Sequence, residues 1–126
     1  MLHNLCKNLD HFKIVVIQAP SIKKDQLNDI LKKYHLNQGA TIVANADKAL
    51  LSKCFYALTK PGSNTLELAL LGVPHAILLP ITWFNKLILD YIIKPKAVGL
   101  PNLLSNNPIC EEFIGKEANP KTLAQH

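Results

Sequence analysis

The sequence has 126 residues, of which 48% are hydrophobic and 18% are charged, and its formal net charge is +5. This length fits one globular domain, so we expect residues 1–126 to form a single domain. No apolar run reaches the roughly 18 residues that a membrane-spanning helix needs, and the first residues lack the continuous apolar stretch of a secretory signal. We therefore expect a cytoplasmic protein without a transmembrane helix.

All fourteen basic residues are lysines. Arginine is the usual residue for bidentate contacts with guanine and phosphate, so an arginine-free chain predicts no nucleic-acid partner. The lysines are explained by solvated helix faces or, alternatively, by attraction to an anionic membrane surface. The three cysteines, Cys6, Cys54 and Cys110, show no CxxC spacing. The five histidines show no HxH or HExxH spacing. We therefore expect free thiols and no metal site.

Segments with helix and strand patterns alternate along the chain. In chain order, the first half predicts a helix at 2–9, a strand at 13–18, a helix at 22–36 capped by Ser21, a strand at 40–43, a helix at 46–51 and a strand at 55–59. The second half predicts a turn at 61–65 followed by a short helix, a strand at 75–79, a helix at 83–93, a strand at 97–100, and helices at 108–114 and from 120 onward. This alternation predicts an α/β fold, a parallel sheet flanked by helices.

The turn at 61–65 reads Pro-Gly-Ser-Asn-Thr and joins an apolar strand to a short helix. Free backbone N–H groups, two hydroxyls and an amide at the positive end of a helix suit a phosphate. Glu67 follows one helical turn later, where a carboxylate suits the hydroxyls of a ribose. The pattern predicts a nucleotide-binding βαβ unit, with candidate binding residues Gly62, Ser63, Asn64, Thr65 and Glu67.

The same turn has a purely structural interpretation. A tight strand-to-helix turn needs a glycine whatever its function. Ser63, Asn64 or Thr65 is equally explained as the helix N-cap, with Glu67 closing a capping box if Asn64 holds the cap position.

Three further polar residues have two interpretations each. Lys60 either offsets diphosphate charge or is solvated. Asn102 is either a turn residue or a polar contact to sugar or phosphate. We expect His75 to be a satisfied, partly buried histidine rather than a base or ligand. In parallel sheets ligands bind beyond the carboxyl ends of the strands, so we expect the loops at 59–65, 80–83 and 101–102 to meet at one edge.

The stretch 61–74 together with Leu100-Pro-Asn-Leu-Leu104 resembles the carboxyl-terminal half of lipid-A-disaccharide synthase, a glycosyltransferase of the GT-B type. More loosely, the likeness runs from residue 13 to residue 123. The resemblance implies a Rossmann-like half of a GT-B fold, incomplete relative to the full family. It also implies that 62–65 hold the UDP diphosphate, that Glu67 binds the ribose, and that Asn102 matches a polar residue of the family.

The resemblance further implies the reaction and its partners. The family transfers an acylated glucosamine from UDP to an acylated glucosamine phosphate at the inner membrane surface, with a UDP-sugar as substrate and no metal or other cofactor. The acceptor-binding domain with its candidate base has no counterpart in this sequence, so the catalytic residues are unknown. We expect this domain to be inactive by itself and active with an acceptor domain or chain.

Two other hypotheses stay open. Unpaired sheet edges recruit partners, so the chain is alternatively a non-catalytic remnant or an interaction module that forms a homodimer. The helix expected at 83–93 alternatively makes a peripheral contact with a membrane, although its apolar side is explained equally by a protein core.

Overall fold

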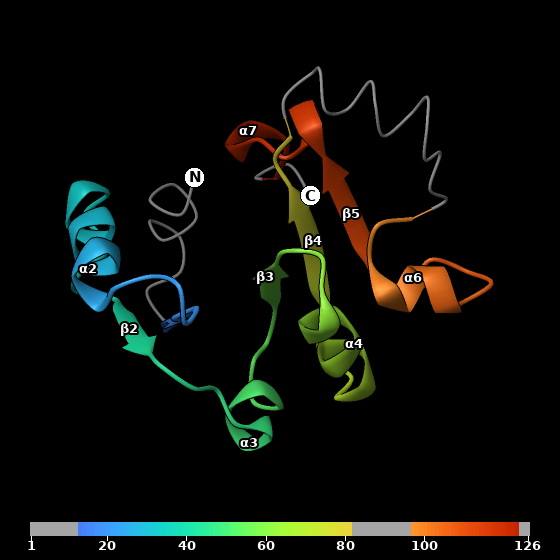
Figure 1. Ribbon diagram of the computed structural model, residues 1–126, viewed down its shortest axis with the longest axis horizontal. Coiled ribbons are helices and arrows are strands. Elements are labelled where there is room, and N and C mark those ends of the chain that lie inside the picture. The colour runs from blue at the N-terminus through green and yellow to red at the C-terminus, as the bar shows by residue number, and fades with distance from the viewer. Residues whose placement is uncertain (1–12, 82–96, 124–126) are drawn as a thin grey trace. The chain divides into compact units, whose positions relative to one another are not determined.

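The computed structural model describes residues 13–81 and 97–123 (Figure 1). The helices expected at 2–9 and 83–93 lie outside these residues. The chain divides into two compact units, Met1–Asp47 and Lys48–His126. The expectation of one domain over 1–126 stays a prediction.

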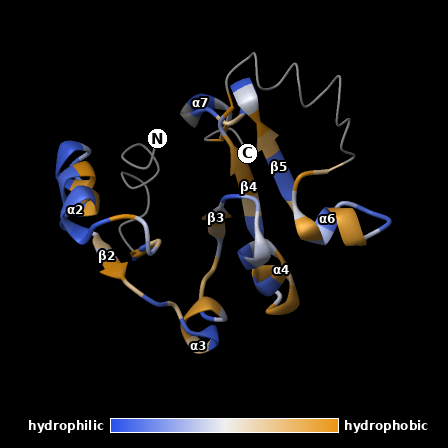
Figure 2. Ribbon diagram, in the orientation of Figure 1, coloured by the Kyte–Doolittle hydropathy of each residue, from blue (hydrophilic) through white to orange (hydrophobic). Residues whose placement is uncertain are grey.

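The described residues of the first unit form a parallel pair of strands and one helix. Strand β1 (Ile14–Ile17) pairs with β2 (Ala40–Val43) in the register Ile14↔Ala40, and α2 (Lys24–Lys33) connects them. The β-branched residues of both strands favour this extended conformation. Figure 2 shows one hydrophobic and one hydrophilic side on α2, whose Leu31 is buried.

Helix α2 starts two residues later than the pattern predicts. Its N-cap is Lys23 and not Ser21, which was the expected cap. The backbone N–H of Lys23 donates to Gln26 Oε1 at 3.0 Å, so a side chain in the first turn satisfies the donor that precedes the helix.

The second unit is built on a three-stranded parallel sheet of order β3-β4-β5. Its elements within 48–81 and 97–123 are α3 (Lys48–Leu51), β3 (Ala57–Thr59), α4 (Ser63–Leu70), β4 (His75–Leu79), α6 (Leu100–Leu104), β5 (Glu111–Ile114), the 3-10 turn η2 (Gly115–Glu117) and α7 (Pro120–Leu123). The register pairs Ala57 with His75 and Ala76 with Glu111. Parallel strands with helices between them confirm the predicted α/β class.

Strand β4 is the centre of this unit. It is paired on both edges, and its Ile77 is completely buried. The other buried apolar residues of this unit include Leu68 of α4, Val73, Ala76 and Phe113 of β5, and α4 also contacts α6. The hydropathy of β4 in Figure 2 fits this position, because a parallel strand covered on both faces has little room for polar residues.

The expected strand at 97–100 is wrong. Leu100 begins α6, and the N–H groups of Val98 and Gly99 donate to the Glu112 carboxylate at 2.8 and 3.0 Å rather than to a strand. Gly99 is also so close to Ile77 that a Cβ on it would overlap the isoleucine side chain. The Glu112 side chain and the packing of Gly99 on Ile77 therefore take the place of the strand pairing that the apolar residues predicted.

The expected helix at 108–114 is also wrong. Glu111–Ile114 forms β5, with Phe113 opposite Leu78 and Ile114 opposite Leu79. The proline at 108 suits a helix start, but the free edge of the buried strand β4 needs hydrogen-bond partners. Tertiary pairing outweighs the local signal here.

The close approach of Gly99 to Ile77 predicts overpacking on substitution. We expect Gly99→Ala to lower the free energy of unfolding by about 1–3 kcal/mol. Adding Ile77→Val removes the methyl group that the new Cβ would meet, so the double variant should recover part of this loss. Urea denaturation followed by circular dichroism measures both, and strictly additive losses would contradict the contact.

Candidate functional site

The turn before α4 depends on glycine for its backbone shape. Gly62 has φ 158° and ψ −174°, a region that only glycine adopts readily. Nothing lies within 4 Å of the place where a Cβ would be, so the constraint is conformational. Gly62, Ser63 and Asn64 are all exposed, which leaves the backbone of the turn open to a ligand.

The start of α4 has no side-chain cap. Its N-cap is Gly62, and Glu67 closes no capping box, so the capping interpretation of this motif is wrong. The N–H and hydroxyl of Thr65 both donate to the Gly62 carbonyl, at 3.1 and 2.6 Å. Within the described part of the chain, the N–H groups of Ser63 and Asn64 have no hydrogen-bond partner. Two donors at the positive end of the helix therefore face solvent.

Helix α4 presents one face to the core and another to a cavity. Thr65 and Leu68 are buried, whereas Ser63, Leu66, Glu67 and Leu70 line a cavity of about 340 Å³. These four positions have the i, i+3, i+4, i+7 spacing of one helix face. Leu71 and Lys48, the first residue of α3, complete the lining.

The predicted site residues thus fall into two groups. Ser63 and Glu67 lie in one cavity, next to the exposed Gly62 and Asn64, and Lys60 is exposed just before the turn. Thr65 is completely buried and bonded to Gly62, so it shapes the turn from inside. Nucleotide binding by these residues stays a prediction.

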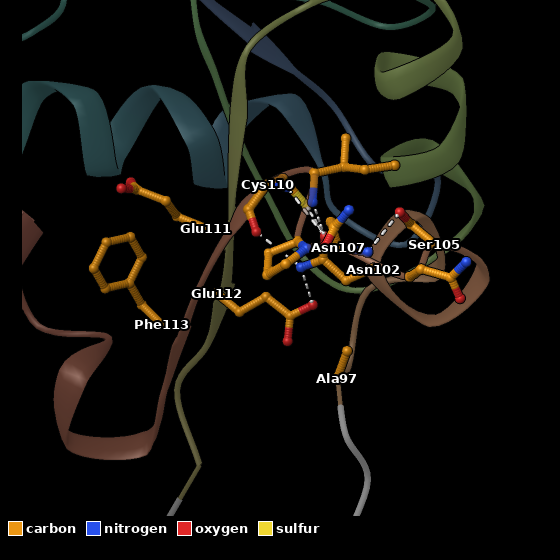
Figure 3. Close-up of a pocket in the computed structure, with 11 residues that line it drawn as sticks. Ala97, Asn102, Ser105, Asn107, Cys110, Glu111, Glu112 and Phe113 are labelled. Atoms are coloured by element: carbon orange, nitrogen blue, oxygen red, sulfur yellow. Dashed lines mark hydrogen bonds between the residues drawn. The ribbon is translucent and has the colours of Figure 1, made fainter.

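Asn102 is part of an internal network and not of this cavity (Figure 3). Its Nδ2 donates to the Cys110 carbonyl and to Glu112 Oε1, both at 2.8 Å. Its Oδ1 accepts from the N–H groups of Ile109 at 2.7 Å and Cys110 at 3.1 Å. Both amide N–H donors and both acceptor positions of Asn102 are therefore occupied.

This network lies where β5 begins, and the Gly62 turn follows the end of β3. Both belong to the same part of the sheet, because Thr59 pairs with Ile77 and Ile77 with Glu112, and α4 contacts α6. That the loops at 59–65, 80–83 and 101–102 meet at one edge stays a prediction, since residues 82 and 83 lie outside the described residues. Asn102 and Glu112 line a second cavity, of about 650 Å³, with the loop that precedes β5. The pattern gave no sign of Glu112 except a charge at the start of an apolar strand.

His75 is buried as predicted, but it is only half satisfied. Its Nδ1 lies 2.9 Å from the Val73 carbonyl, which can only accept, so Nδ1 carries the proton. Its Nε2 is then a buried acceptor, and it has no partner among the described residues.

Both described cysteines are free, as predicted. Burial raises the pKa of the Cys110 thiol, the Glu112 carboxylate raises it further, and the hydrogen bond with Asn102 opposes these effects in part. The thiol is therefore a poor nucleophile at neutral pH. Within 13–81 and 97–123, no cluster of three or more histidines, cysteines or carboxylates is placed to hold a metal, and no helix has the length and apolar character to cross a membrane.

The parallel sheets, their connecting helices and the glycine turn beyond β3 define a Rossmann-like α/β fold. A family model described as lipid-A-disaccharide synthetase matches residues 1–126. The chain therefore belongs to the lipid-A-disaccharide synthetase family, which confirms the resemblance seen in its motifs.

Individual relatives agree with the family model. The chain is 28% identical over 114 residues to the lipid-A-disaccharide synthase of Saccharophagus degradans, covering 90% of this chain and 29% of that protein. It is 32% identical to that of Chlamydia pneumoniae, covering 86% of this chain and 19% of that protein. It is 41% identical over 58 residues to that of Rickettsia bellii. The chain thus spans less than a third of the length of the curated relatives it matches.

The Asn102 network predicts a large effect of one amide. Asn102→Asp removes both Nδ2 donors and sets a carboxylate beside Glu112, so we expect a loss of about 2–4 kcal/mol in the free energy of unfolding at pH 7. Acidification should restore part of it, since protonation removes the repulsion. The exposed Asn107→Asp is the charge-matched control. Equal losses for both variants in urea denaturation would contradict the network.

The raised pKa of Cys110 predicts slow alkylation. In a Cys6→Ser/Cys54→Ser variant, the rate with iodoacetamide should rise only at a higher pH than for N-acetylcysteine, because less thiolate is present. The same variant in urea serves as control and should follow the free thiol. A folded variant with the same pH profile as the unfolded one would overturn this assignment.

Proposed function

We propose that the chain is the UDP-sugar-binding half of a lipid-A-disaccharide-synthase-like glycosyltransferase. Completed by an acceptor domain, it would transfer an acylated glucosamine from UDP to an acylated glucosamine phosphate. Family membership over residues 1–126 supports the reaction class. The unsatisfied start of α4, beside a cavity that Ser63 and Glu67 share, supports the place of the donor.

The proposed roles follow from the chemistry of these groups. A diphosphate at the Gly62 turn would accept hydrogen bonds from the N–H groups of Ser63 and Asn64 and gain from the helix dipole. Glu67, one turn further along the same face, would accept hydrogen bonds from the ribose hydroxyls. Leu66 and Leu70 supply apolar wall to the same cavity, which suits the rest of a nucleoside.

The acceptor and its base belong to a partner in this proposal, either another part of the protein or a second chain. The reaction would use no metal or other cofactor, and the complete enzyme would work in the cytoplasm, peripherally at the inner membrane where its lipid substrates lie. Asn102 would act by positioning α6 and β5 rather than by touching the sugar, since its hydrogen bonds are internal. The alternative of a non-catalytic dimerising module gains no support from the comparisons.

The proposal predicts UDP binding at the start of α4. Titrating UDP into the ¹⁵N-labelled chain should shift the amide signals of Gly62, Ser63, Asn64 and Glu67 at millimolar ligand or below. Glu67→Gln should weaken binding about tenfold, because it removes charge from the ribose contact. Glu117→Gln, an exposed glutamate in η2, is the control and should leave binding unchanged.

Two outcomes would refute this assignment. One is the absence of any shift at 62–67. The other is equal binding by the wild type and the Glu67→Gln variant, which would remove the carboxylate from the site.

A further inference from the structure

Lys48 shares the cavity of the predicted donor site, although it is fifteen positions before Ser63 in the sequence. It is the first residue of α3, and its side chain lines the cavity together with Ser63 and Glu67. The other lining residues are leucines, so Lys48 is the cation of this cavity.

Lys48 is exposed at the start of α3, which is a single turn of four residues, so its side chain has no packing role there. Within the described part of the chain, its ammonium forms no ion pair, and Glu67 in the same cavity forms none either. Two opposite charges in one cavity thus remain available to different groups of a ligand.

The two charges suit the two ends of a sugar nucleotide. The backbone donors at the Gly62 turn supply dipoles but no net positive charge, whereas a diphosphate carries a negative charge that needs a countercharge. This chain has no arginine, so within it a lysine is the side chain that supplies a lasting positive charge. Lys60 precedes the turn but is not part of the cavity lining, whereas Lys48 lines the cavity itself. A lysine ammonium is a point charge with three donors on a long flexible stem, which fits a contact across a cavity.

We propose that Lys48 is a binding residue for the diphosphate of the donor nucleotide, its ammonium donating to a phosphate oxygen while Glu67 holds the ribose. This inference rests on the proposed function. It separates two recognition tasks in one cavity of about 340 Å³, a volume within the range of small-molecule sites. The sequence pattern placed this lysine among the solvated helix faces.

The test compares ligands that differ only in phosphate. Isothermal titration calorimetry measures UDP, UMP and uridine with the wild type, Lys48→Gln, Lys48→Arg and Lys53→Gln. Lys53 is exposed, follows α3 and lines neither cavity, so it is the charge-matched control. We expect Lys48→Gln to weaken UDP binding about tenfold and uridine binding by less than about twofold. Lys48→Arg should restore UDP binding, and Lys53→Gln should not change it.

The outcomes separate this inference from the proposed function. If the wild type binds UDP and Lys48→Gln binds it equally well, the inference fails and the proposed function stands. If Lys48→Gln weakens uridine as much as UDP, the lysine shapes the cavity and does not contact phosphate, which also overturns the inference. If the wild type binds no UDP, both proposals fall.

Discussion

The Glu112 carboxylate fixes the connections of the second unit to one another. It accepts hydrogen bonds from the N–H groups of Val98 and Gly99 and from the Asn102 amide. Asn102 in turn accepts hydrogen bonds from the N–H groups of Ile109 and Cys110, which lead into β5. A partly buried charge is tolerated only when such donors surround it. Because β5 pairs with the buried strand β4, the same bonds tie α6 to the centre of the sheet. Helix α4 contacts α6 and so packs against an element that these hydrogen bonds hold in place.

The two cavities differ in what their polar groups are free to do. The larger one is lined at its centre by Asn102 and Glu112, whose donors and acceptors are used within the protein, and otherwise by residues that include the exposed Asn106 and Asn107. The smaller one is lined by Ser63, Glu67 and Lys48, beside helix donors that have no partner among the described residues. Unused hydrogen-bonding capacity, rather than volume, is the sign of a binding site, because satisfied groups gain nothing from a ligand.

The sequence pattern predicted the structure correctly where the conformational preferences of neighbouring residues determine it. The sequence pattern predicted β2 and β4 with their observed bounds, and the glycine turn before α4, because β-branched runs and a glycine-only backbone region are written in single residues. The pattern failed at 97–100, where the Glu112 carboxylate of β5 accepts the backbone hydrogen bonds, and at 108–114, where pairing with the edge of β4 makes the segment a strand. The network around Glu112 and the position of Lys48 in the smaller cavity were missed for the same reason, since both depend on distant segments.

The lysine-only composition affects how a donor site of this kind can work. The planar guanidinium of arginine forms two hydrogen bonds to a phosphate in a fixed geometry, whereas the ammonium of lysine supplies charge without a fixed direction. In the proposed site, the orientation of a diphosphate would come from the backbone donors of Ser63 and Asn64, whose direction the Gly62 conformation sets. In the proposed site, α3 would thus supply the charge and the turn before α4 would supply the direction. The angle of approach would then depend on the Gly62 conformation and on Thr65, whose N–H and hydroxyl both hold the Gly62 carbonyl from inside the turn.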